Sequence, residues 1–166
     1  MLVLVGVIAD THGYVDPNLA QVFRDVELIV HAGDIGSPAV LDALGAIAPV
    51  RAVRGNVDRS LPLQALPERI DLRLHGIGLH LVHQLPQAIP LPQRKILVFG
   101  HSHRSLNEWR GSILYLNPGA AGRQGFHTIR TVALLRLEGQ PESELVVLGP
   151  KARSKISGVA DDNELS

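Results

Sequence analysis

The stretch Ile8-Ala9-Asp10-Thr11-His12-Gly13 ends an apolar run with a carboxylate, a hydroxyl and an imidazole in consecutive positions. The run itself, residues 1–8, is rich in Val, Leu and Ile, which is typical of a fully buried β-strand. Side chains two residues apart in a strand share a face, so a near-extended backbone through Thr11 would point Asp10 and His12 at one spot. Alone, this ending also fits a turn or a helix cap. Apolar strands that end in similar polar residues recur further along the chain, and this recurrence favours a metal site.

Length and composition predict one globular domain with an aliphatic core. The chain has 166 residues, of which 45% are hydrophobic, 4% aromatic and 19% charged. Its 16 basic and 16 acidic residues balance, so no general affinity for nucleic acid or for an anionic membrane is expected. The chain has no cysteine, which excludes disulfides and leaves nitrogen and oxygen as metal ligands. The apolar start lacks a basic region and is too short to span a membrane, which predicts a cytoplasmic protein.

Further along the chain, strands and helices alternate and a strand-rich half follows. Ser37 as N-cap and Pro38 at the first helical position mark the start of the second helix. A stretch containing Pro86, Pro90 and Pro92 excludes a regular helix. Residues 1–150 are expected to form one domain, and the polar segment 151–166 a disordered tail. The predicted strands are 1–8, 27–31, 50–54, 68–74, 77–82, 95–99, 108–110, 113–116, 130–137 and 144–148, and the predicted helices are 19–26 and 38–48.

Side chains with metal-binding chemistry stand at or just after the ends of the predicted strands. They are Asp10, His12, Asp34, Asn56, His83, His101 and His103. In α/β sheets, ligands bind beyond the carboxyl ends of the strands, so this placement brings the side chains to one rim. Their mixture of oxygens and imidazoles exceeds the needs of one tetrahedral zinc and suits two ions that share a carboxylate. Each residue has an ordinary alternative, as a surface histidine, a turn residue or a helix cap, but their conjunction favours metal binding.

These residues resemble the motifs of the calcineurin-like metallophosphoesterases, especially the small bacterial and archaeal phosphodiesterase branch. The resemblance implies an α/β fold in which a two-sheet β-sandwich is flanked by helices. It covers most of the chain and includes a loop that this branch places after its last metal motif. The matching segments, in order, are Asp10-Thr11-His12, Gly33-Asp34, Gly55-Asn56-Val57-Asp58, His83, Gly100-His101-Ser102-His103 and Asn117-Pro118-Gly119.

The resemblance also implies a ligand set. Asp10, His12, Asp34 and His103 would hold one divalent ion, and Asp34, Asn56, His83 and His101 a second, with Asp34 bridging. Mn is the expected metal, with Ni, Fe, Co and Zn as alternatives. The implied reaction is hydrolysis of a phosphodiester by a hydroxide that bridges the two ions.

Three residues are assigned to the catalytic machinery: Asn56, Asp58 and His83. Asp58 is not a ligand in this scheme, and we expect it to accept a hydrogen bond that orients a histidine ligand. The loop 119–131, with Arg123, His127 and Arg130, receives no catalytic role. His31, His75 and His80 are expected to be packing or hairpin residues.

The sequence departs from the family pattern directly after His83 and directly after Asn56. Gln84 follows His83 where the family usually has Gly, and Val57 stands where many members have a histidine that is a candidate general acid. A phosphomonoesterase, which needs the same ions, is an alternative, with Arg123 as the candidate cation for the extra charge. A second alternative is a non-catalytic scaffold like the retromer subunit of the same fold. The expected partner is a small phosphoester substrate and not a membrane, and the oligomeric state stays open.

Overall fold

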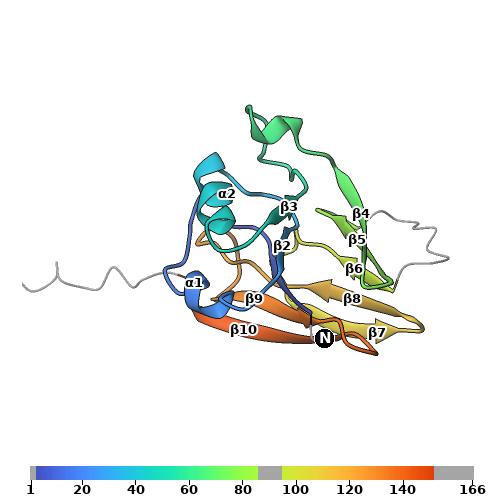
Figure 1. Cartoon of the computed structure of the whole chain (residues 1–166). Coiled ribbons are helices and arrows are strands. Elements are labelled where there is room, and N and C mark those ends of the chain that lie inside the picture. The colour runs from blue at the N-terminus through green and yellow to red at the C-terminus, as the bar shows by residue number, and fades with distance from the viewer. Residues whose placement is uncertain (1–2, 86–94, 152–166) are drawn as a thin grey trace, which may run out of the picture.

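The computed structural model describes residues 3–85 and 95–151, which form two five-stranded β-sheets packed face to face (Figure 1). The predicted Pro-rich stretch and the predicted tail after Lys151 lie outside these residues. The domain boundary at residue 150 therefore stays a prediction. Sheet A contains, in spatial order, β10 (Glu142–Pro150), β9 (Ile129–Arg136), β1 (Leu4–Ile8), β2 (Leu28–His31) and β3 (Val50–Ala52). Sheet B contains β4 (Arg69–Leu74), β5 (Ile77–Val82), β6 (Ile96–Val98), β8 (Ile113–Asn117) and β7 (Leu106–Arg110).

The helices are short and lie on the outer face of sheet A (Figure 1). They are α1 (Leu19–Val22) and α2 (Pro38–Gly45), and a 3-10 turn, η1 (Leu63–Ala65), follows β3. The side chain of Ser37 caps α2 as predicted, accepting a hydrogen bond from the backbone N–H of Ala39. Both helices end earlier than predicted, because turns that bury Phe23 and Ala48 replace their last residues. The predicted α/β sandwich flanked by helices is confirmed.

The core explains why β1 is apolar along its whole length. Val5 and Val7 face the core between the two sheets, whereas Ile8 faces the cluster under the helices. Strands buried on both faces cannot alternate polar and apolar residues. At Gly6, a Cβ atom would lie 2.9 Å from the ring of Phe23, so only glycine lets this aromatic side chain pack on the strand.

The topology positions the functional edge of the molecule. β1, β2 and β3 are parallel to one another, as are β5, β6 and β8, so each set ends at one edge of its sheet. The loops that follow β1 and β2 in sheet A meet the loops that follow β5 and β6 in sheet B. The hydrogen bond from the His101 N–H to Oδ2 of Asp10 and the contact between Nδ1 of His83 and the Ala32 carbonyl show this. No helix within residues 3–85 and 95–151 is long and apolar enough to cross a membrane.

Candidate metal centre

Most of the predicted ligands occupy a backbone conformation that side chains rarely adopt. The φ angles are 53° at Asp10, 45° at His12, 54° at Asp34, 71° at His101 and 60° at His103. Left-handed backbone costs a non-glycine residue of order 1 kcal/mol or more, and such residues cluster at functional sites. The extended backbone that we predicted between Asp10 and His12 is therefore wrong. Their side chains converge through left-handed backbone at both residues and not through the pleat of a strand.

Backbone hydrogen bonds between two loops hold these left-handed conformations. The loop after β1 donates from Asp10 to the Gly33 carbonyl and from His12 to the Asp34 carbonyl, both at 3.0 Å. Each hydrogen bond connects a predicted ligand to the loop after β2. The strained conformations are thus held by the same contacts that bring the two loops together.

His31, the last residue of β2, contacts both of these loops through its ring nitrogens. Its Nδ1 accepts a hydrogen bond from the Gly33 N–H at 3.1 Å, and its Nε2 lies 3.0 Å from Oγ1 of Thr11. Burial lowers the pKa of His31 to about 3, so the ring stays neutral and Nδ1 stays an acceptor. The predicted packing role is thus extended, because the ring also fixes the position of the ligand loops.

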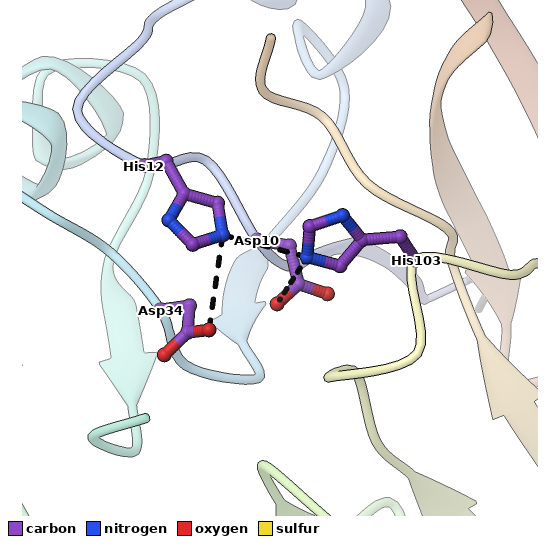
Figure 2. Close-up of side chains that lie close together, drawn as sticks. All are labelled: Asp10, His12, Asp34 and His103. Atoms are coloured by element: carbon purple, nitrogen blue, oxygen red, sulfur yellow. Dashed lines mark hydrogen bonds and ion pairs between the residues drawn. The ribbon is translucent and has the colours of Figure 1, made fainter. Parts of the chain in front are cut away.

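Four predicted ligands form one compact cluster, shown in Figure 2: Asp10, His12, Asp34 and His103. One ligand atom from each lies within 4.8 Å of the others. Nε2 of His12 is 3.7 Å from Oδ2 of Asp34, and Nε2 of His103 is 3.6 Å from Oδ1 of Asp10. Two carboxylates and two imidazoles at this spacing suit a divalent transition-metal ion.

The environment of Asp10 supports this interpretation. Its Oδ2 accepts a hydrogen bond from the backbone N–H of His101 at 3.0 Å. Its Oδ1 is buried and has no hydrogen-bond partner among the described residues. A buried carboxylate oxygen without a partner is costly. A cation within the cluster would satisfy it, so the residues present fit a metal ion.

His83 and His101 adjoin the cluster on the far side of Asp34. Nε2 of His83 lies 3.4 Å from Oδ2 of Asp34 and 3.3 Å from Nδ1 of His101. Nδ1 of His83 is 2.8 Å from the Ala32 carbonyl. A carbonyl only accepts, so Nδ1 carries the proton and the lone pair of neutral His83 lies on Nε2, directed at Asp34.

Asn56 and Asp58 lie in the turn after β3. The Asn56 side chain is exposed and makes no hydrogen bond to the other predicted ligands within the described residues. Its neighbour Val57 donates its N–H to Oδ1 of Asp34 at 3.1 Å. The structure therefore brings six of the seven predicted ligands together and places Asn56 on the adjoining turn.

The hydrogen bonds of Asp58 differ from the expected ones. Its carboxylate accepts the backbone N–H groups of Ile35, Gly36 and Gly55, at 3.1, 3.0 and 2.8 Å. Within the described residues it makes no hydrogen bond to a histidine ligand, so the predicted orienting contact is wrong. Asp58 instead connects the loop after β2, which carries Asp34, to the turn after β3.

The two aspartates of the cluster have pKa values shifted in opposite directions. Burial raises the pKa of Asp10 to about 7, and the charge of Asp34 adds to this shift. Burial also opposes ionisation of Asp34, but hydrogen bonds from His83 and Val57 outweigh it and lower its pKa to about 2. Burial opposes charge on His83, yet the hydrogen bond and charge of Asp34 raise its pKa. A bound cation would replace the proton that Asp10 and His83 otherwise hold.

Stabilisation by metal should therefore depend on pH. The pKa of Asp10 rises from 3.8 to about 7 on folding, so this group favours the folded state at low pH and the contribution disappears as pH rises through about 7. Metal binding removes the penalty at high pH, where Asp10 is ionised. We expect the increase in Tm caused by excess Mn²⁺ to grow from pH 5.5 to pH 8 in thermal melts. An increase in Tm that does not change with pH would contradict this electrostatic account.

The loop 119–131 contains polar residues with distinct roles. Arg130 is buried, forms an ion pair with Asp16 and donates to the Pro150 carbonyl, so it is structural. Arg123 is exposed, and its guanidinium carbon lies 4.2 Å from the ring centre of Tyr14. His127 contacts the predicted ligand His103, a contact that sequence reasoning missed. The only sequence signal for it was a histidine in a loop already called polar.

The fold and the cluster together define a metal-binding protein of the α/β class. Residues 3–140 match the calcineurin-like phosphoesterase superfamily domain. A probable metallophosphoesterase from Methanothermobacter thermautotrophicus is 32% identical, over 91% of this chain and 96% of that protein. The chain belongs to the calcineurin-like phosphoesterase superfamily. The predicted resemblance to its small bacterial and archaeal members is confirmed.

Two experimental structures are similar over nearly their whole length. An archaeal phosphodiesterase has a TM-score of 0.74 and 25% identity, with 87% of this chain and 99% of that chain covered. Vps29 from Entamoeba histolytica in complex with Zn²⁺ has a TM-score of 0.65 and 21% identity, with 88% and 99% covered. The second similarity concerns the fold alone.

Proposed function

We propose that this protein is a phosphodiesterase that uses two divalent metal ions, with Asp34 shared between them. The observation that carries the proposal is the position of Asp34 Oδ2, 3.7 Å from Nε2 of His12 on one side and 3.4 Å from Nε2 of His83 on the other. Mn²⁺ is the metal we favour, and the mixed carboxylate and imidazole ligands also suit Fe²⁺, Co²⁺, Ni²⁺ and Zn²⁺. Similarity to an archaeal phosphodiesterase supports the diester as substrate.

The ligand sets follow from the two groups of contacts. Asp10, His12 and His103 would hold the first ion with Asp34, and His83 and His101 would hold the second with the same carboxylate. Asn56, on the adjoining turn, is assigned to the second ion by the family resemblance and not by a contact. When bound, such a pair lowers the pKa of a shared water to near neutrality and neutralises phosphoryl oxygens during in-line attack.

The protein holds several of the proposed ligands in position before metal binds. The Val57 N–H holds Oδ1 of Asp34, which leaves Oδ2 directed at both histidines. Asp58 fixes the turn on which Asn56 stands by accepting three backbone N–H groups. The Ala32 carbonyl fixes the proton on Nδ1 of His83, so loss of the other proton leaves the lone pair on Nε2 without any rotation of the ring. Ligands held this way need little reordering when metal binds.

Two other functions fit the same fold. Vps29 shares it, and a scaffold of this type would use its surface and not its rim. Oδ1 of Asp10 is buried and has no hydrogen-bond partner in the part of the chain that the structure describes, which argues against a site with a purely structural role. Without a cation, this oxygen would only destabilise the fold. A phosphomonoesterase would need an added cation for the extra charge, and among the described residues the exposed guanidinium of Arg123, over the Tyr14 ring, favours it.

A comparison of two chromogenic esters tests the proposal. We expect Mn²⁺-loaded protein to hydrolyse bis(4-nitrophenyl) phosphate with a kcat/KM at least tenfold higher than that for 4-nitrophenyl phosphate. The same assay with Mg²⁺, Zn²⁺, Ni²⁺ and Co²⁺ tests the metal preference. Faster hydrolysis of the monoester, reduced selectively by Arg123→Ala, would establish the phosphomonoesterase instead. No hydrolysis of either ester by protein that has bound Mn²⁺ would favour the scaffold.

A further inference from the structure

The segment 122–127 is packed closely around the predicted ligand His103. The Gly122 N–H donates to the Asp10 carbonyl at 3.0 Å, which attaches the segment to the loop after β1. Gly125 has a φ of 118°, and a Cβ at this position would lie 2.0 Å from Nδ1 of His103. Lys151 donates through Nζ to the Gly125 carbonyl at 2.6 Å and holds the segment from outside. The backbone therefore leaves just enough space for the His103 ring.

His127 completes this enclosure with two hydrogen bonds. Its Nε2 lies 2.8 Å from the Gly122 carbonyl, and its Nδ1 lies 3.3 Å from Nδ1 of His103. The two rings are 5.2 Å apart between centroids and inclined at 70°. This edge-on arrangement directs a ring nitrogen of each histidine at the other.

The Gly122 carbonyl decides which nitrogen carries each proton. A carbonyl only accepts, so Nε2 of His127 is protonated and Nδ1 of the neutral ring is an acceptor. That acceptor requires a proton on Nδ1 of His103. The lone pair of neutral His103 then lies on Nε2, the nitrogen that faces Oδ1 of Asp10 at 3.6 Å and Nε2 of His12 at 3.4 Å.

We infer that His127 is a positioning residue that fixes the tautomer and ring orientation of His103 for metal binding, by transmitting the hydrogen-bond direction of the Gly122 carbonyl. The inference rests on the proposed metal-dependent function. His83 obtains the same result directly from the Ala32 carbonyl at 2.8 Å. Hydrogen-bond partners behind metal-binding histidines generally set the tautomer in this way.

This role separates His127 from a general acid. Both of its ring nitrogens are engaged, one by a carbonyl and the other by His103. A donor to the leaving group needs a nitrogen that is free to reach the substrate. Loss of His127 should therefore weaken metal binding, whereas loss of a general acid would lower turnover at full metal occupancy.

The first test needs no metal. Long-range ¹H–¹⁵N correlation spectra of metal-free protein labelled with [¹⁵N]histidine, recorded near neutral pH, report the tautomer of each neutral ring. We expect His103 in the form protonated at Nδ1 and His127 in the form protonated at Nε2. His103 protonated at Nε2 in the wild-type protein would overturn the inference, whatever the metal-binding result.

The second test measures Mn²⁺ affinity by competition with a chelator. His127→Phe keeps the ring volume and removes both hydrogen bonds, and it should weaken one of two Mn²⁺ sites about 10-fold to 100-fold. His127→Asn retains an acceptor oxygen close to the position of Nδ1 and should restore most of the affinity. Phe126→Ala is the matched control, because this neighbouring side chain is fully exposed, and it should leave both sites unchanged.

The outcomes distinguish this inference from the proposed function. Wild-type affinity in His127→Phe, or an equal loss in Phe126→Ala, would overturn the positioning role. A wild-type protein that binds no Mn²⁺ would refute the proposed function, and the tautomer spectra alone would then decide the hydrogen-bond chain. If His127→Phe does not fold, rescue of affinity in His127→Asn relative to His127→Ala decides the question.

Discussion

Asp34→Asn should abolish most of the hydrolytic activity, with kcat/KM for an aryl phosphodiester falling about 10³-fold or more. Such a fall corresponds to a loss of several kcal/mol of transition-state stabilisation at two ions, at about 1.36 kcal/mol per factor of ten. Oδ2 of Asp34 lies between His12 and His83, so losing its charge affects both ligand groups. Asn still offers an oxygen to the Val57 N–H, so the variant should fold.

Elemental analysis after Mn²⁺ loading and desalting checks this expectation together with kinetics. Asp34→Asn should lose both ions, whereas His12→Ala and His83→Ala should each mainly lose one. Asp42→Asn, an exposed carboxylate on α2, is the control and should keep wild-type metal content and rate. Full metal content in Asp34→Asn, or loss of one ion only, would show that Asp34 does not bridge.

The second large effect concerns the leaving group. By the family resemblance, Val57 stands where a histidine would be the candidate general acid, and this valine is 47% exposed. A general acid contributes about 10² to 10⁴ in rate, and its absence matters most for leaving groups of high pKa. We therefore expect kcat to fall steeply as leaving-group pKa rises from aryl to alkyl phosphodiesters.

Val57→His should partly relieve this dependence and accelerate alkyl esters more than aryl esters. The N–H of residue 57 binds Asp34, so an imidazole there starts beside the proposed bridging carboxylate. Leu61→His is the matched control, because Leu61 is 75% exposed further along the same loop. Its substitution should leave the dependence of kcat on leaving-group pKa unchanged. A flat dependence with chemistry rate-limiting would mean that another group supplies the proton.

Most of the fold was predictable because its strands are buried on one or both faces. The apolar run that ends at Ile8 forms the central strand of sheet A. The predicted ligands that follow this strand therefore mark the end of the sheet at which the site lies. The pairing of the two sheets came from the family resemblance and not from periodicity, since a strand pattern does not state its neighbours. Helix ends were less predictable, because burial of Phe23 in a turn overrides helical spacing.

The site was predictable in its residues but not in its geometry. Residue types do not reveal that Asp10 and His12 adopt left-handed backbone, because that conformation depends on hydrogen bonds to Gly33 and Asp34. The role of Asp58 was mistaken for a similar reason. Its partners are backbone N–H groups from two loops, and such contacts leave no trace in residue identity.

The histidines show the same limit. His31 ends an apolar strand and was expected to be a packing or hairpin residue, and it is fully buried. Its hydrogen bonds to Gly33 and Thr11, however, depend on the folded loops. His127 lies 24 residues from His103 in the sequence, and only the closure of the loop brings them into contact.

The number of metal ions per chain tests the central claim most directly. Purified wild-type protein, stripped with a chelator, reloaded with excess Mn²⁺ and desalted, should contain two Mn²⁺ per chain by elemental analysis. Electron paramagnetic resonance should then show a spin-coupled pair, because one carboxylate joins the ions. One ion per chain, two uncoupled ions or only a trace of metal would contradict the account of Asp34 as a shared ligand.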